Sequence, residues 1–121
     1  MKIISISAAP LVKRQYGIMQ LIAGPNAEQS MKTSRVDVKI LEIDAMSQTS
    51  KHYHLESDSI FLVIDGEAEL ETLDQCEPMK PGDAARVPPR EFHMLRNTTQ
   101  HKCKVLEIMS PPYRKEDLFY E

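Results

Sequence analysis

Short segments of alternating apolar and polar residues run along the chain, and no stretch of a dozen residues repeats with the period of an amphipathic helix. Residues 36–43 alternate in this way, with Asp37 and Lys39 on one side of a strand and apolar residues on the other. Further strands are expected at residues 3–7, 16–22, 59–64, 67–73, 84–88, 91–97 and 102–110. Strands spaced about ten residues apart, without a long helix, predict an all-β sandwich or barrel.

The remaining stretches predict loops. Residues 23–34 are small and polar, and residues 110–121 form a tail with one short helical turn at 114–119. No repeat or linker divides the sequence, so we expect residues 1–121 to fold as a single domain.

Composition narrows the classes of function. The 121 residues are 41% hydrophobic and 27% charged, as in a soluble globular protein. The net charge is −3 without a basic stripe, so nothing favours nucleic-acid binding. The apolar runs are strand-sized and the first ten residues lack a signal-peptide core, so we expect no membrane span and no export. Cys76 and Cys103 are too few for a disulfide scaffold, which favours a reducing cytoplasm.

Two histidines stand close together in the stretch "KHYHLESDS". On a strand, His52 and His54 point to the same face and Tyr53 to the other. Two such imidazoles can bind one metal ion with a third ligand from a neighbouring strand. By itself the pattern is weakly specific, because it also occurs on solvated strand edges.

A second stretch, "PGDAARVPPREFHMLRN", adds a third histidine at a regular spacing. Together, residues 46–66 and 82–97 resemble the two motifs of the cupin family, G-x5-H-x-H-x3,4-E-x6-G and G-x5-P-x-G-x2-H-x3-N. The residues at the family spacing are His52, His54, Gly66, Gly82, Pro88, His93 and Asn97. The resemblance covers residues 36–110. It implies a small jelly-roll β-barrel that is open at one end, with the histidines pointing into its mouth.

The chain departs from the family pattern at three positions. Met46 and Arg90 stand where the motifs have glycine or another small residue, and Ser59 stands where the first motif has its glutamate. Asp58 takes the place of the glutamate when the shorter spacing is counted from His54, although a shift of one residue along a strand reverses the face. Otherwise a three-histidine site remains, with water in the open positions.

The resemblance implies a divalent transition metal held by His52, His54 and His93, with Asp58 as a candidate fourth ligand. Three histidines alone bind zinc and some iron ions. The sequence does not choose among iron, manganese, zinc and nickel. The alternative is that the histidines are relics in a barrel that binds no metal, since family resemblance preserves fold more reliably than function.

Two functions are compatible with such a site. A metal-dependent enzyme would act on a small polar substrate by isomerisation or, with iron, by dioxygenase chemistry. Isomerisation needs a general base, and Asp58, Glu56 and a water on the metal are the candidates. Arg90, beside the mouth, is a candidate for binding an anionic group of the substrate. With an incomplete ligand set, the barrel would instead be a non-catalytic module that binds or senses a small molecule.

The two ends of the chain add further signals. "KVLEIMSPPYRKEDLFYE" resembles the last strand and tail of cupins related to mannose-6-phosphate isomerase-type enzymes, through residues 106–108, 111–112 and 116–117. This resemblance favours carbohydrate chemistry. Residues 3–7 would form an exposed apolar edge strand that needs covering. Because small cupins commonly dimerise, often through their front strands, we expect a homodimer.

Overall fold

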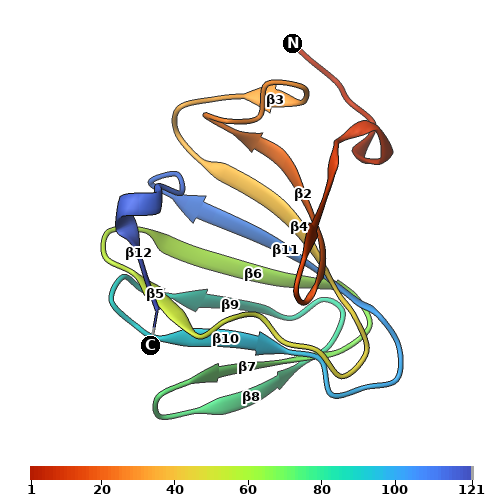
Figure 1. Ribbon diagram of the computed structural model, residues 1–121, viewed down its shortest axis with the longest axis vertical. Helices are drawn as coiled ribbons and strands as arrows, with labels where there is room; N and C mark the ends of the chain where they lie inside the picture. Colours follow the sequence, from red (N-terminus) through yellow and green to blue (C-terminus); the bar gives the residue numbers. More distant parts are fainter. Residues whose placement is uncertain (121) are drawn as a thin grey trace.

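The protein folds into two β-sheets that pack face to face, in a computed structural model that describes residues 1–120 (Figure 1). The larger sheet has seven strands in the order β1-β2-β4-β11-β6-β9, with β3 beside β2. They are β1 (Leu11–Arg14), β2 (Gly17–Gly24), β3 (Met31–Lys32), β4 (Asp37–Ile43), β6 (Asp58–Asp65), β9 (Ala84–Val87) and β11 (Cys103–Ser110). The smaller sheet has five strands in the order β12-β5-β10-β7-β8. They are β5 (His52–His54), β7 (Ala68–Thr72), β8 (Cys76–Met79), β10 (His93–Arg96) and β12 (Leu118–Tyr120). The all-β jelly-roll prediction is confirmed.

Apolar side chains fill the space between the two sheets. Among the most deeply buried are Ile43 of β4 and Val105 of β11. Leu41 lies beside them in the same core, and side chains alternate along a strand, so Asp37 and Lys39 also face the interior. The charged side of β4 is therefore its inner side.

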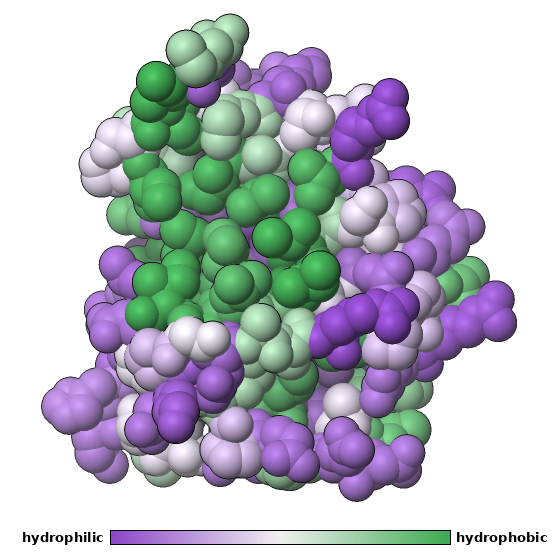
Figure 2. Space-filling view, turned by 180° about the vertical axis from the view of Figure 1, so that it is seen from behind, coloured by the Kyte–Doolittle hydropathy of each residue, from purple (hydrophilic) through white to green (hydrophobic). Residues whose placement is uncertain are grey.

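The outer face of the larger sheet is also apolar, whereas the outer face of an antiparallel sheet is commonly polar. Ile22 and Ile40 pack there beneath Ile4 and Ala9 of the N-terminal segment. Farther along this sheet, Ile60 of β6 remains 39% exposed. Figure 2 shows apolar side chains gathered over one broad area of the molecule, with polar residues around it.

The first ten residues do not form the predicted edge strand. They contain a 3-10 turn, η1 (Ile6–Ala8), whose backbone hydrogen bonds close locally. Gln20 Nε2 donates to the carbonyl oxygens of Ile6 and Ala9 at 2.9 and 3.1 Å. With these backbone groups satisfied, the segment lies against the sheet face instead of extending its edge, and the strand prediction for residues 3–7 was wrong. Within residues 1–120, no helix has the length and apolar character needed to cross a membrane.

The tail contributes a strand that the sequence reasoning missed. The predicted helical turn is present as η2 (Lys115–Asp117), and β12 follows it directly. β12 pairs with β5, so that Leu118 lies opposite His54 and Tyr120 opposite His52. Figure 1 shows the C-terminal end lying beside β5. The tail therefore covers the free edge of the strand that carries two of the histidines.

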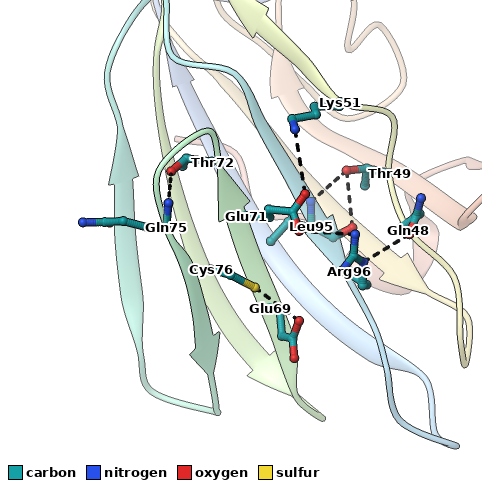
Figure 3. A network of polar contacts seen from close by, with 10 residues as sticks. All are labelled: Gln48, Thr49, Lys51, Glu69, Glu71, Thr72, Gln75, Cys76, Leu95 and Arg96. Carbon is teal, nitrogen blue, oxygen red and sulfur yellow. Dashed lines mark hydrogen bonds and ion pairs between the residues drawn. The ribbon is translucent and has the colours of Figure 1, made fainter. Parts of the chain in front are cut away.

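Polar contacts hold the segment before β5 against the smaller sheet (Figure 3). The Leu95 backbone N–H of β10 donates to Thr49 Oγ1 at 2.9 Å. Glu71 of β7 lies 3.9 Å from Lys51 and 3.3 Å from Arg96. Because β5 is only three residues long, these contacts from its flank help to fix its position in the sheet.

Candidate metal centre

Three histidine side chains meet on the inner face of the smaller sheet. His52 of β5 and His93 of β10 lie directly opposite each other, and His54 follows two residues later on the same face. The ring centroids are 4.6 Å apart for His52 and His93, 5.0 Å for His52 and His54, and 5.8 Å for His54 and His93. One ring nitrogen from each histidine lies within 4.8 Å of those from the other two. Three nitrogens at this spacing can converge on one metal ion.

Hydrogen bonds fix the tautomer of two of these rings. Nδ1 of His52 lies 2.8 Å from the carbonyl oxygen of Ser50, and Nδ1 of His93 lies 3.0 Å from that of Glu91. A carbonyl oxygen only accepts, so Nδ1 carries the proton in both rings and Nε2 presents its lone pair. Metal-binding histidines commonly have their second nitrogen held in this way.

Several nitrogens of the cluster have no protein partner within the described residues. Nε2 of His93 and both ring nitrogens of His54 are buried without a hydrogen bond. Buried polar atoms are nearly always paired, and each unpaired one costs about 1–3 kcal/mol. A metal ion would satisfy the free lone pairs, so these three residues fit a divalent transition metal.

The electrostatic environment keeps the cluster neutral. Burial lowers the pKa of His52, His54 and His93, and the neighbouring histidines lower it further for His52 and His54. The pKa of His54 falls to about 3. A neutral imidazole is the form that binds a metal, so at neutral pH no proton has to be displaced.

The two carboxylates expected near the histidines, Glu56 and Asp58, lie in exposed ion pairs. Glu56 Oε2 is 2.6 Å from Arg114 Nη2, and Asp58 Oδ1 is 2.6 Å from Arg86 Nη2. Within residues 1–120, the group of side chains that can hold a metal contains the three histidines and neither of these carboxylates. The structure thus does not bring the predicted fourth ligand and the predicted general bases to the cluster.

Ser59 shows why Asp58 points away. On β6 the buried side chains are those of Ser59, Phe61 and Val63, and Asp58 has the opposite orientation. Ser59 is 1% exposed and its Oγ has no hydrogen-bond partner in the described chain. The strand therefore keeps the register of the first motif and has a serine at the inward position of the glutamate.

The two motif positions that lack a small residue keep the backbone conformation that suits glycine. The φ angle is 58° at Met46 and 73° at Arg90, a left-handed region that costs a residue with a Cβ atom about 1–2 kcal/mol. The Arg90 backbone N–H donates to the His54 carbonyl at 2.6 Å. Its side chain is exposed and is not among those that line the cavity described below. The structure thus gives the Arg90 backbone, and not its guanidinium, a contact with the site.

The last residue of the second motif has a structural role. Asn97 Nδ2 donates to the carbonyl oxygens of Ile43, Asp44 and His101 at 3.0, 3.1 and 2.7 Å. Its Oδ1 accepts from the backbone N–H of Thr99 at 3.0 Å. Asn97 therefore ties together the loops at one end of the barrel and is not available as a metal ligand.

A cavity of about 430 Å³ lies between the histidines and the larger sheet. His52 and His54 line it on one side. Lys39 and Glu107 line it from the larger sheet, where they are direct partners in the pairing of β4 with β11. The volume is within the range of small-molecule pockets, and the polar groups face it from both sheets.

Glu107 is a functional candidate that sequence reasoning did not single out. It is 7% exposed, and burial raises the pKa of its carboxyl group, while the positive charge of Lys39 lowers it by a smaller amount. The signal was nevertheless present in the sequence. Cys103 stands between Lys102 and Lys104, a pattern that predicts an inward cysteine, and alternation along β11 gives Glu107, four residues later, the same inward direction.

Comparisons with known proteins agree with this geometry. Residues 39–109 match the family described as Cupin domain. An uncharacterised protein of Aquifex aeolicus is 32% identical over 113 residues, which cover 88% of this chain and 84% of that protein. A solved structure from Planctomyces limnophilus is 27% identical, with a TM-score of 0.77 over 99% of this chain and 96% of that one.

A third comparison concerns a structure from Silicibacter pomeroyi, described as a sugar phosphate isomerase from a cupin superfamily. It is 19% identical, with a TM-score of 0.75 over 90% of this chain and 75% of that one, which is a likeness of fold. The family match covers most of the two-sheet barrel and includes all three histidines. The protein therefore belongs to the cupin family.

Proposed function

We propose that the protein is a metal-dependent enzyme that acts on a small polar substrate in the cavity between its sheets. The supporting observation is the convergence of three histidines, two of which, His54 and His93, have buried ring nitrogens without a hydrogen-bond partner within the described chain. His52, His54 and His93 would hold a divalent transition metal there. When bound, the ion would supply a Lewis acid that polarises a substrate oxygen.

The opposite wall of the cavity favours isomerisation over oxygenation. Isomerisation requires a general base within reach of the substrate, to move a proton between neighbouring carbon atoms. Glu107 faces the cavity, and burial raises the pKa of its carboxyl group, the direction that suits a base working near neutral pH. Glu56 and Asp58 are held in exposed ion pairs, so Glu107 takes the role first assigned to them.

Two similarities support a carbohydrate substrate. The Silicibacter pomeroyi structure with the same fold is described as a sugar phosphate isomerase. The resemblance of the tail to mannose-6-phosphate isomerase-type cupins remains a prediction and agrees in direction. Neither identifies a particular sugar.

Solvent deuterium exchange would test this function. The protein would be loaded in turn with Fe²⁺, Mn²⁺, Zn²⁺ or Ni²⁺ and incubated in D₂O with aldose and ketose sugars and their phosphates. We expect deuterium in the product of at least one pair, slowed about 100-fold in Glu107→Gln and abolished in His93→Ala. Glu56→Gln serves as the matched control and should exchange normally. The absence of both deuterium exchange and turnover with all four metals would contradict the proposal.

A non-catalytic binding module is the second candidate function, and Ser59 is the observation that favours it. A site that lacks the carboxylate of the family can hold a small molecule without converting it. This function predicts saturable binding of a ligand by the metal-loaded protein without any change in the ligand. Isothermal titration calorimetry beside the exchange assay separates the two candidates.

We also propose that two copies associate through the outer face of the larger sheet. Ile60 and Ile64 of β6 are 39% and 48% exposed there. An exposed apolar patch can pack against its own copy across a two-fold axis. Sedimentation velocity should give a dimer for the natural chain and a monomer for an Ile60→Asp, Ile64→Asp double variant. A monomeric natural chain at micromolar concentration would contradict the association.

A further inference from the structure

Lys39 places a positive charge on the wall of the cavity. It is half-buried on the inner side of β4, opposite Glu107, and its Nζ lies 4.6 Å from the centre of the Tyr113 ring. No hydrogen bond and no ion pair within 4.0 Å reaches Nζ from residues 1–120. Lysines are rarely buried unless they are paired, because removing the ammonium from water is costly. Among the described residues, the cavity thus contains a cation without a counter-ion within 4.0 Å.

The nearby carboxylates do not supply that counter-ion. Asp37 faces the same cavity, but its Oδ2 accepts the backbone N–H of Tyr113 at 2.6 Å and so anchors the tail. Gly24 is required there, because a Cβ atom at this position would collide with the Asp37 carboxylate. Asp37 and Glu107 both interact with Lys39, but only at longer range. Arg14 lines the same cavity as a second cation.

We infer that Lys39 binds the anionic group of the ligand, and that the protein accepts small polyhydroxy compounds carrying a carboxylate or a phosphate. The role of the polyhydroxy part of the ligand, which would react at the histidines, rests on the proposed function. An anion at Lys39 would place the polyhydroxy chain between the larger sheet and the histidine cluster. Glu107 and the Tyr113 ring flank Lys39 and would limit where the anion can sit.

The two ends of this arrangement are close enough for one small molecule. Lys39, His52 and His54 line a single cavity. The charge of Lys39 also contributes to the lowered pKa of both histidines, which places it within electrostatic range of them. A ligand held by its anionic group at Lys39 would therefore extend towards the histidine nitrogens.

Three compounds with one carbon skeleton test the inference, namely sorbitol, gluconate and sorbitol 6-phosphate. Binding would be measured by isothermal titration calorimetry, with and without one equivalent of Zn²⁺. We expect at least one of the two anions to bind about tenfold more tightly than sorbitol in both states, as a charged hydrogen bond allows. Whichever anion binds more tightly shows whether the site prefers a carboxylate or a phosphate. The preference should disappear in Lys39→Met and persist in Lys39→Arg.

Lys104→Met is the matched control, because Lys104 lies on the outward side of β11, and it should keep the preference. Thermal melting would check the fold of each variant, and Lys39→Gln replaces Lys39→Met if the latter unfolds. Equal affinity for all three compounds, including no measurable affinity for any, overturns the inference. A preference that survives in the folded Lys39 variant overturns it as well.

The same titrations separate this inference from the proposed function. An anion preference that depends on Lys39, in a protein that retains no metal, supports the inference and contradicts the proposed enzyme. Bound metal and turnover without an anion preference support the enzyme and contradict the role of Lys39.

Discussion

The stretch "KHYHLESDS" contains two pairs of polar residues whose side chains lie in opposite environments, one pair inside the barrel and one pair at its surface. His52 and His54 point into the barrel, where neither ring nitrogen of His54 has a hydrogen-bond partner within residues 1–120, whereas Glu56 and Asp58 lie in exposed ion pairs with arginines. All four positions are even-numbered, so a single strand would present them on one face. The chain bends after β5 and enters β6 in the other sheet, where odd-numbered residues face inward. Alternation assigns faces within one strand, and a bend between strands resets it.

The largest effect expected from this contrast is a change in metal affinity. His93→Ala removes a ligand whose Nε2 lone pair is buried and held towards the other two histidines, so zinc affinity should fall by about 100-fold or more. Glu56→Gln and Asp58→Asn should leave it unchanged, because both side chains are engaged by arginines. Competition with a chromophoric zinc chelator measures all three. A loss in Asp58→Asn equal to that in His93→Ala would show that Asp58 is a ligand after all.

Adding a carboxylate at the inward position sharpens the comparison. Ser59→Glu places an acid where the family has one, so metal affinity should rise by about tenfold. Without metal, the buried carboxylate lacks a partner and the melting temperature should fall. Ser59→Gln has the same length without the charge and is the control. Equal zinc affinity in both variants would mean that residue 59 does not reach the metal.

Acid should destabilise the metal-free protein through the same histidines. His54 stays neutral in the folded protein down to its pKa of about 3, whereas an unfolded histidine takes up a proton near pH 6.5. The unfolded state therefore binds more protons below pH 6.5, and the free energy of unfolding falls by up to about 1.4 kcal/mol per pH unit for such a group. Urea unfolding across this range measures the slope. His54→Gln should have a shallower slope, and an unchanged slope would contradict the burial of a neutral ring.

The smallest expected effects concern the two left-handed residues. Met46→Gly and Arg90→Gly should each stabilise the protein by about 0.5–1 kcal/mol, because glycine adopts a positive φ without the penalty of a Cβ atom. Arg35, an exposed loop residue outside the positive-φ group, is the control, and Arg35→Gly should be slightly destabilising. Denaturant midpoints compare the variants. Destabilisation by both motif substitutions would show that the side chains matter more than the backbone.

Much of the fold was predictable because it rests on local patterns. Alternation located most strands of the larger sheet, and the glycine turns fixed the register of the two motifs. The strand expected at residues 3–7 failed because Ile4 and Ala9 pack on the outer face of the sheet, a tertiary contact without a local signature. β12 was missed for the same reason, since its pairing with β5 joins residues more than 60 positions apart.

The candidate site also contains residues that the sequence predicts and residues that only the folded structure brings together. His52, His54 and His93 were found because motif spacing identifies them. Lys39 and Glu107 come from two strands that are distant in sequence and become neighbours only in the β4–β11 pairing. Each carried the signal of a charge on the inner side of a strand, but alternation alone does not say which side of β4 is the inner one.

The most direct test of the account is the metal content of the purified, untagged protein, beside that of a His52→Ala, His54→Ala double variant. Elemental analysis should find close to one equivalent of a transition metal per chain in the natural protein, as isolated or after reconstitution, and almost none in the variant. A natural chain that retains no metal even after reconstitution would contradict the central claim. The cavity would then belong to a cupin that uses its histidines for something other than metal.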